Sequence, residues 1–226
     1  MVLDEKYDVI VVGGGHAGCE AAYSAAKMGA NVLMITMNMQ TIGQMSCNPA
    51  MGGVAKGQIV REIDALGGGS ARITDKSMIQ FRMLNRSKGP AMWSPRVQSD
   101  RMLFAQYWRE LLEETPGLNM FQDMVTGLNV SDNTVHGVRT ALGLTFEAQT
   151  VVLTSGTFMN GLIHVGDQNF GGGRAGERAS TGITEELVAM GVEAGRMKTG
   201  TPPRIDGRSL DFSVMEEQPG DERPGQ

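Results

Sequence analysis

A glycine-rich turn near the start of the chain constrains its fold more than any other feature. Residues 8–12 form a short β-branched apolar run that leads directly into residues 13–18, which match the pattern G-x-G-x-x-G. Residues 19–28 are rich in helix-forming side chains, and Gly29 stands where such a helix would stop. A second apolar run follows at residues 31–36. This order predicts a βαβ unit and therefore an α/β fold of the Rossmann type.

The three motif glycines have separate roles in a dinucleotide-binding unit. Gly13 permits the tight turn, Gly15 lets a pyrophosphate approach the backbone, and Gly18 lets helix and strand pack closely. The N–H groups of the helix start then face the phosphates. An acidic residue that would bind the ribose 2′-OH is expected about 20 positions on, but the second strand ends at Asn38. Asn38 can substitute as a hydrogen-bonding group, and this unit alone does not decide between FAD and NAD.

Composition and charge disfavour several classes of protein. The 226 residues carry a net charge of -5, with a pI near 5.3, which argues against a globally basic nucleic-acid binder. Any RNA contact must then come from local patches. Two cysteines are too few for a disulfide framework and indicate a reducing compartment. No apolar stretch approaches the length of a membrane span. We therefore expect a cytoplasmic protein without a membrane partner.

A loop that contains a cysteine follows the βαβ unit. Pro49 and the glycine pair after it give this loop a defined shape, and Cys47 lies within it. Residues 54–66 predict a helix with three apolar residues on one face, Ile59, Ile63 and Leu66. Cys47 thus precedes a helix start, where a thiol can be shifted toward the nucleophilic thiolate. A buried, inert cysteine is the alternative. Cys19, within the first predicted helix, is assigned to packing.

A basic segment lies between residues 81 and 101, where a single acid, Asp100, opposes five cations: Arg82, Arg86, Lys88, Arg96 and Arg101. Within it, residues 85–96 carry two prolines and Trp93, which favour a loop over a helix. Such a loop is either solvated surface or a site that grips phosphates and stacks a base. Ser99 is predicted to cap the next helix, with Leu103, Tyr107 and Leu111 spaced for burial.

The second half of the chain predicts more sheet. Residues 118–149 read as a small antiparallel β-meander, with strands at 120–125, 128–130, 135–140 and 144–148. Residues 150–157 form a continuous apolar run that ends in small residues, which suits a central parallel strand whose end touches a ligand. A glycine-rich stretch precedes a helix predicted from Glu185 to about Met190, with Thr184 as its cap. Residues 211–226, acidic and rich in Pro and Gly, are expected to be disordered or extended.

Several motifs together carry a family resemblance. They are GGGHAGCEAA (13–22), QMSCNPA (44–50), QFRMLN with SKGPA (80–85 and 87–91), GGRAG (172–176) and KTGTPPR (198–204). On these segments the chain resembles the amino-terminal part of the MnmG/GidA family, the tRNA uridine 5-carboxymethylaminomethyl modification enzymes. The resemblance implies a Rossmann-like FAD-binding domain of the glutathione-reductase-like type over residues 1–210, within a fragment of a longer protein.

The resemblance also implies an activity and its site. Members use FAD, with NADH as reductant and methylene-tetrahydrofolate as carbon donor, to modify the wobble uridine of tRNA. They form homodimers that work with the GTPase MnmE in a heterotetramer. By position, the expected FAD contacts are Gly13, Gly14, Gly15, His16, Ala17, Gly18, Val125 and Ser180. Cys47 is the expected catalytic residue, and Arg82, Arg86, Lys88 and Arg96 are the expected tRNA contacts.

Three other functions remain open from the sequence. A folate- and FAD-dependent tRNA uridine methyltransferase differs in whether NADH, folate and a glycine or ammonium donor are all required. A flavin-dependent disulfide oxidoreductase needs two cysteines close in sequence, whereas Cys19 and Cys47 fall on different elements. A nucleotide-binding or RNA-binding module without catalysis would be favoured if the purified full-length protein carried no flavin absorbance.

Overall fold

A six-stranded mixed sheet forms the main layer of the computed structural model, which describes residues 2–200 and 202–222. Its strands lie in the order β6-β2-β1-β9-β8-β7. Their bounds are β1 (Val2–Val12), β2 (Val32–Thr36), β6 (Leu118–Gln122), β7 (Val125–Ser131), β8 (Thr134–Thr140) and β9 (Thr145–Leu153). β1 pairs in parallel with β2 and β9, and β2 pairs in parallel with β6. The predicted βαβ unit and the α/β fold class are confirmed.

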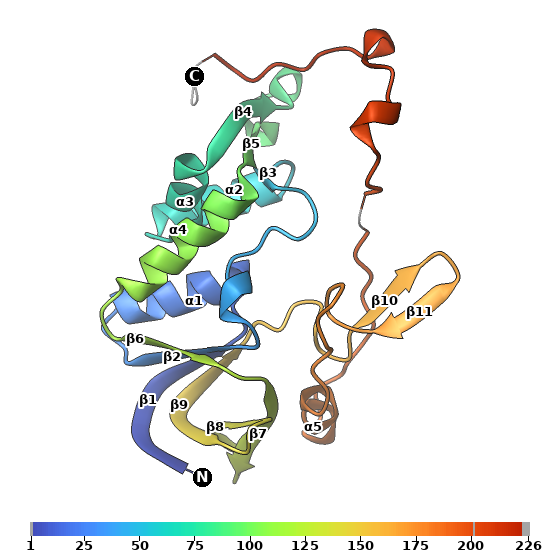
Figure 1. Ribbon diagram of the computed structural model, residues 1–226. Coiled ribbons are helices and arrows are strands. Elements are labelled where there is room, and N and C mark those ends of the chain that lie inside the picture. The colour runs from blue at the N-terminus through green and yellow to red at the C-terminus, as the bar shows by residue number, and fades with distance from the viewer. Residues whose placement is uncertain (1, 201, 223–226) are drawn as a thin grey trace.

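Helix α1 (His16–Lys27) covers one face of this sheet (Figure 1). It packs closely because small residues face the strands: Ala22 and Ala26 are buried, and Gly18 lies against the turn. A Cβ atom on Gly18 would lie 1.8 Å from the Gly13 carbonyl oxygen. This observation confirms the packing role predicted for Gly18.

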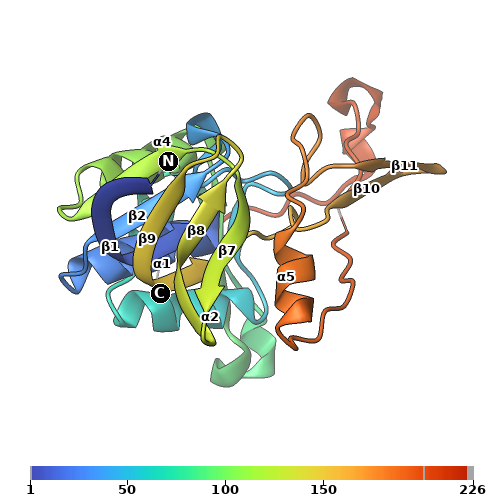
Figure 2. The same ribbon diagram turned by 90° about the horizontal axis from the view of Figure 1, so that it is seen from below.

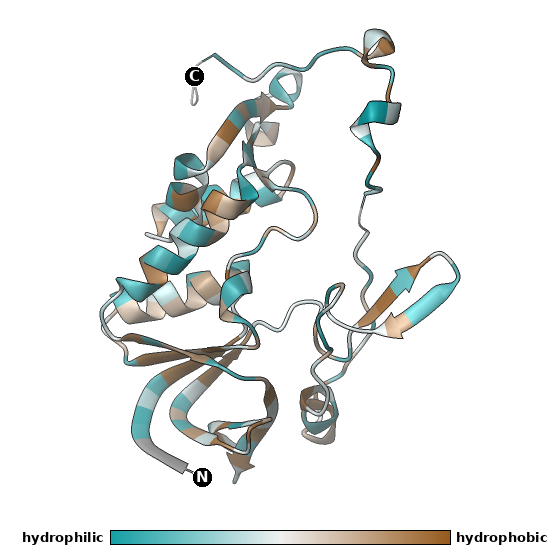
Figure 3. Ribbon diagram, viewed as in Figure 1, coloured by the Kyte–Doolittle hydropathy of each residue, from teal (hydrophilic) through white to brown (hydrophobic). Residues whose placement is uncertain are grey.

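The two faces of the sheet bury separate apolar clusters. On the α1 side, Val11 and Met34 pack with Phe104 and Trp108, which come from α4 (Arg101–Glu113). On the other side, Ile10 and its neighbours pack against the curled β7, β8 and β9 strands. Hydropathy colouring shows hydrophobic residues concentrated in the strands beneath α1 (Figure 3). Ile10 and Val11 point to opposite faces of the sheet, and both are buried. Both faces of β1 are therefore apolar, which explains the continuous apolar run in its sequence.

A second, smaller sheet lies beyond α1. It contains β3 (Ala50–Gly52), β5 (Ser94–Ser99) and β4 (Met78–Leu84), in that order, all antiparallel. Helices α2 (Lys56–Ala65) and α3 (Ser70–Lys76) connect β3 to β4, and the short 3-10 turns η2 (Arg86–Lys88) and η3 (Pro90–Met92) connect β4 to β5. The loop predicted over residues 85–96 is confirmed as far as Trp93, where it connects β4 to β5, whereas residues 94–96 already belong to β5.

The remaining elements extend to one side of the sheet. They are the hairpin β10 (Leu162–Val165) and β11 (Gln168–Gly171), followed by α5 (Ile183–Ala189), whose N-cap is Gly182 rather than the predicted Thr184. Viewed from below, both the hairpin and α5 lie beyond the β7 edge (Figure 2). The chain then runs, with the 3-10 turns η4 (Gly207–Ser209) and η5 (Phe212–Val214), back to β4, where Asp221 donates its N–H to the Phe81 carbonyl at 2.8 Å. Residues 223–226 of the predicted extended or disordered end lie outside the described residues.

The predicted antiparallel β-meander is confirmed, but its strand bounds need correction in two respects. Its first strand, β6, ends at Gln122 and pairs in parallel with β2, so it belongs to the Rossmann half of the sheet. The predicted strands at 144–148 and 150–157 are one strand, β9, which pairs antiparallel with β8 and parallel with β1. Only β7, β8 and β9 form an antiparallel meander.

Two helix predictions also need correction. The N-cap of α4 is Asp100, not Ser99, because the Asp100 carboxylate accepts the N–H groups of Met102 and Leu103 at 2.8 and 3.1 Å. The fully buried face of α4 carries Phe104, Trp108 and Leu112, one position after each residue predicted. In α2 the predicted apolar face is largely uncovered, with Ile59 54% and Leu66 90% exposed.

Candidate functional site

A cavity of about 410 Å³ opens at the carboxyl ends of β1, β2 and β9. This is the edge at which doubly wound sheets bind their ligands. The cavity brings together many residues singled out in the sequence, although they lie far apart along the chain: Gly13, Gly14, Gly15, His16, Asn38, Cys47, Val125 and Ser180. Ala17 and Gly18, also expected to contact FAD, are not among the lining residues.

The glycine-rich turn is shaped for close approach by a ligand. Gly13 has φ +113, and a Cβ there would lie 2.7 Å from the Thr154 carbonyl oxygen, so only glycine fits. Gly15 differs, because its φ is ordinary and a Cβ there would meet no atom within 4 Å. Protein packing therefore does not require glycine at position 15. The space next to the α1 N-terminus, where backbone N–H groups favour an anion, is left open.

A buried hydroxyl in the cavity wall also fits a bound dinucleotide. Within the described part of the chain, the Ser155 Oγ atom is buried and has no hydrogen-bond partner. Ser155 follows β9, the strand that pairs with β1, and lines the cavity next to the glycine-rich turn. Buried polar atoms are nearly always satisfied, and the place of this hydroxyl in the cavity wall suits a hydrogen bond to a ligand oxygen or nitrogen. The open space at Gly15 and the orphaned Ser155 hydroxyl both suit the expected FAD.

Val125 and Ser180 form the wall at the start of β7. The Ser180 hydroxyl donates to the Val125 carbonyl at 3.0 Å and so ties the segment after β11 to the sheet. Asn38, at the position of the absent acidic residue, also lines the cavity. Its side-chain oxygen accepts the Gln40 N–H at 2.8 Å, which caps the 3-10 turn η1 (Met39–Thr41). The amide NH₂ is the part of Asn38 left to face a ligand.

Arg174 joins two walls of the cavity and was not predicted as a site residue. Its guanidinium donates to Glu177 at 2.6 Å and to Thr41 Oγ1 at 3.3 Å, and also to Gln44 Oε1. The same group lies 5.2 Å from the centre of the Phe158 ring. Arg174 thereby links the glycine-rich segment to the loop after β2. The only sequence signal was its position within the GGRAG motif.

The two cysteines occupy opposite environments. Cys47 is exposed and lines the cavity. The predicted helix after it is confirmed as α2, but the short strand β3 lies between Cys47 and the helix start. Cys19 is buried in α1, where its thiol donates to the Gly14 carbonyl at 3.5 Å. Burial raises the pKa of Cys19 to about 12. Cys19 is therefore a packing residue and is poorly suited to form a redox pair with Cys47.

The four basic residues expected to contact tRNA share one hairpin outside the cavity. Arg82 and Arg96 face each other across β4 and β5, and Arg86 and Lys88 lie on η2. Two of them already contact the end of the described chain: Arg82 donates to Gln218 at 3.2 Å, and Arg86 pairs with Asp221 at 2.9 Å. The four residues form a basic strip along the hairpin.

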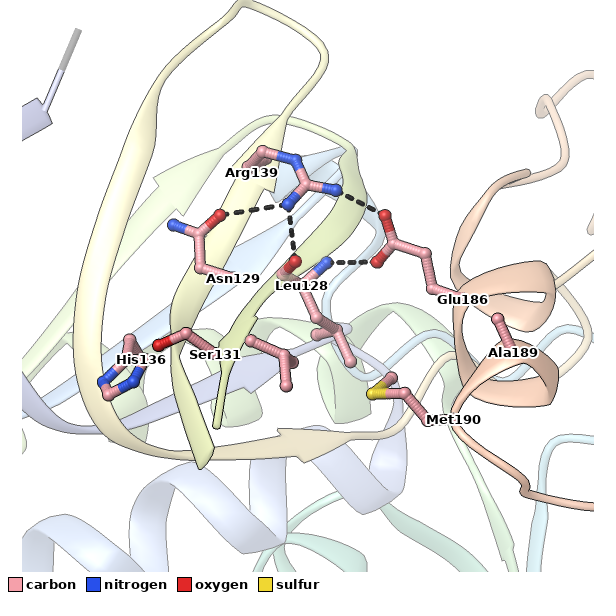
Figure 4. A pocket seen from close by; sticks show the side chains of 9 residues that line it. Leu128, Asn129, Ser131, His136, Arg139, Glu186, Ala189 and Met190 are labelled. Carbon is pink, nitrogen blue, oxygen red and sulfur yellow. Dashed lines mark hydrogen bonds and ion pairs between the residues drawn. The ribbon is translucent and has the colours of Figure 1, made fainter. Parts of the chain in front are cut away.

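A second cavity of about 420 Å³ lies between β7, β8 and α5 (Figure 4). Its polar residues hold α5 against the edge of the sheet. Glu186 accepts the Leu128 N–H at 2.6 Å and pairs with Arg139, which also donates to the Leu128 carbonyl at 2.5 Å. No sequence motif pointed to this cavity, and every charged group that lines it has a structural contact.

Comparison with known proteins decides the family. The family model described as "Glucose inhibited division protein A" matches residues 8–226. The chain belongs to the GidA family. The "tRNA uridine 5-carboxymethylaminomethyl modification enzyme MnmG" of Christiangramia forsetii is 68% identical over 224 residues, 99% of this chain and 36% of that protein. The protein of the same name from Cytophaga hutchinsonii is 69% identical over 97% of this chain and 35% of its own length.

Solved structures agree with this assignment to the GidA family. The form II crystal structure of Aquifex aeolicus GidA matches with a TM-score of 0.91 and 49% identity, over 96% of this chain and 36% of that one. The GidA-related protein of Thermus thermophilus, at 24% identity and a TM-score of 0.58, shares the fold. The chain thus spans about a third of the length of the curated relatives it matches. No helix in the described ranges is long and apolar enough to cross a membrane.

Proposed function

We propose that the full-length protein is an FAD- and NADH-dependent enzyme that modifies tRNA. It adds a carboxymethylaminomethyl or aminomethyl group at C5 of the wobble uridine, takes the carbon from methylene-tetrahydrofolate, and works as a homodimer with the GTPase MnmE. Relatives up to 69% identical bear the name of this tRNA modification enzyme. The observation that carries the proposal is the shared cavity, which joins the glycine-rich turn to Cys47.

FAD would be held by the turn from Gly13 to Gly15, by the Ser155 hydroxyl and by the wall around Val125 and Ser180. When bound, it supplies the electron transfer that links NADH to the modification. His16 contributes to the shape of the site, because its ring nitrogen contacts the Gly43 carbonyl at 3.2 Å. Burial, followed by the charge of Lys56, lowers the pKa of His16, so the imidazole is favoured in its neutral form.

The chemistry proposed for the thiol follows from the low reactivity of uridine C5. A thiolate that adds to C6 forms an S–C6 bond and shifts the C5=C6 electron pair into an enolate. C5 then attacks the methylene carbon of an iminium derived from methylene-tetrahydrofolate, and the C=N electron pair moves onto the nitrogen. Loss of the C5 proton to a base and cleavage of the S–C6 bond restore the ring and the thiolate. Cys47 either adds to C6 or serves as the acid or base, with a cysteine outside this chain in the other role.

A pair of cysteine variants tests the proposal. In cells that lack the full-length protein, we expect Cys47→Ser to abolish the modified uridine, while FAD content and tRNA affinity stay near normal. Cys19→Ser, the matched control, should restore modification. Mass analysis of hydrolysed tRNA measures the product and also distinguishes a methyluridine, the product of the alternative methyltransferase. Normal modification by Cys47→Ser would remove this residue from the chemistry.

A further inference from the structure

The GGRAG motif folds into a tight turn beside the cavity that contains the glycine-rich turn. The Glu177 N–H donates to the Arg174 carbonyl at 3.0 Å, and the Gly173 N–H donates to the Glu177 carbonyl at 3.2 Å. Gly176 has φ +81 within this turn, a conformation that favours glycine. A Cβ on Gly173 would lie 2.1 Å from the Phe158 Cδ1 atom, so glycine lets the turn pack against that ring. The backbone on both sides of Arg174 is therefore fixed by the fold.

The Arg174 guanidinium has hydrogen-bond acceptors on two separate segments. In its own turn, Nε donates to the Glu177 carboxylate at 2.6 Å. Across the cavity wall, Nη2 donates to Thr41 Oγ1 at 3.3 Å, and Nη1 donates to Gln44 Oε1. Both of these acceptors belong to residues 37–49, the β2–β3 loop. All four side chains line the cavity, so the guanidinium links two parts of its wall.

The contacts on the β2–β3 loop continue to residues placed to meet a ligand. The Thr41 hydroxyl, which accepts from Arg174, donates to the Asn38 carbonyl at 3.1 Å. Gln44 lies three residues before Cys47, and both line the cavity. Arg174 therefore holds the part of the loop that runs from Asn38 toward Cys47.

The environment of Arg174 strengthens this link. The Arg174 and Glu177 side chains are only 23% and 20% exposed, and the guanidinium also lies 5.2 Å from the centre of the Phe158 ring. An ion pair so enclosed is screened less than one on the open surface. The charge also reaches the glycine-rich turn. Burial is the main cause that lowers the pKa of His16, and the charges of Lys56 and Arg174 act in the same direction.

We propose that Arg174 is a positioning residue that links the β2–β3 loop to the GGRAG turn and thereby slows the release of the flavin cofactor from the cavity. It acts through Thr41 and Gln44, which hold the loop in place along the cavity wall. This inference rests on the proposed function, in which the cavity binds FAD.

Exchange of bound, radiolabelled FAD against an excess of unlabelled FAD measures release from the full-length protein. We expect Arg174→Met to speed this exchange by about tenfold, the effect of losing one charge-assisted hydrogen bond. Arg174→Lys keeps the charge, but a compact ammonium does not span the three acceptors that the planar guanidinium reaches. The lysine variant should therefore also exchange faster than the wild type.

A double-mutant cycle tests whether the link itself is responsible. Gln44→Leu removes an acceptor on the β2–β3 loop and leaves the pair of Arg174 with Glu177 in place. It should speed exchange to a smaller extent than Arg174→Met. The double variant should exchange no faster than Arg174→Met alone, because both changes remove the same link. If the two effects multiply instead, the two side chains hold FAD independently and the inference is overturned.

Arg139→Met is the matched control. Arg139 also pairs with a glutamate, Glu186, and donates to a backbone carbonyl, but it lines the second cavity beside α5 (Figure 4). Its FAD exchange should equal that of the wild type. Thermal unfolding of the flavin-free proteins compares what each lost ion pair costs the fold. Similar unfolding in Arg139→Met and Arg174→Met, with fast exchange only in the latter, separates a role in cofactor retention from a purely structural one.

Two outcomes distinguish this inference from the proposed function. If Arg174→Met does not fold, Arg174→Lys and Gln44→Leu provide the same comparison. Wild-type exchange rates in folded variants of Arg174 and Gln44 overturn the inference and leave FAD binding intact. A wild-type full-length protein that binds no FAD overturns the proposed cofactor itself.

Discussion

Gly18 and Gly15 of the glycine-rich turn have different roles: the first is needed for packing, and the second leaves space for a ligand. A Cβ on Gly18 would overlap the Gly13 carbonyl, whereas a Cβ on Gly15 would enter open space beside the α1 N-terminus. We expect Gly18→Ala to destabilise the fold by about 1–3 kcal/mol through overpacking. Gly15→Ser should leave stability within about 0.5 kcal/mol, since serine is a good N-cap, but should sharply reduce bound FAD. Thermal unfolding and flavin absorbance of the full-length protein separate the two effects. Full flavin content in Gly15→Ser would contradict the assignment of the turn to the pyrophosphate.

The site residues that could be predicted from the sequence are those whose residue type allows few roles. Gly13, Gly15 and Cys47 were identified because glycine and cysteine in these contexts have few roles, and the fold brings them to one cavity. Arg174 was missed because its contacts join segments about 130 residues apart.

The start of α4 provides a test at the scale of an element. Asp100 accepts two backbone N–H groups of the first turn, whereas the neighbouring Ser99 hydroxyl is buried without a hydrogen-bond partner in the described structure. We expect Asp100→Ala to lower the free energy of unfolding by about 1 kcal/mol, the usual value for a lost cap. Ser99→Ala should change it by less than about 0.5 kcal/mol or raise it slightly, because a buried unsatisfied hydroxyl is removed. Chemical denaturation measures both, and the reverse order would restore Ser99 as the cap.

Elements with a strong local signal were predicted well, and those defined by their partners were not. β1, α1 and β2 follow from periodicity and glycine placement. β9 was divided into two strands because it pairs antiparallel with β8 through residues such as Phe146 and in parallel with β1 as far as Leu153. The orientation of a strand's partner leaves no mark in its own sequence. Similarly, the periodicity of α2 defined an apolar face but not what would cover Leu66, which is 90% exposed.

Across the whole molecule, the distribution of charge is more informative about nucleic-acid binding than the net charge is. The net charge is -5, yet the β4–β5 hairpin carries a basic strip whose inner member, Arg96, acts with burial to lower the pKa of Lys56 at the cavity. Arg82 and Arg96 lie on the paired strands, and Arg86 and Lys88 lie on η2 at the tip of the hairpin. The tip is partly neutralised, because Asp221 accepts both the Met83 N–H at 2.7 Å and the Arg86 guanidinium.

This partial neutralisation predicts unequal contributions to tRNA binding. In the full-length protein, Lys88→Gln should reduce the slope of log K against log salt by about 0.7–1, the value for one lost phosphate contact. Arg86→Gln should reduce it less, since the Asp221 carboxylate already balances that guanidinium. Asp221→Asn should steepen the slope and raise affinity at low salt, because it leaves the Arg86 charge for a phosphate. Fluorescence anisotropy with labelled tRNA over a salt series measures all three. Equal slopes in every variant would mean that tRNA phosphates do not follow this hairpin, and the four basic residues would then be solvated surface.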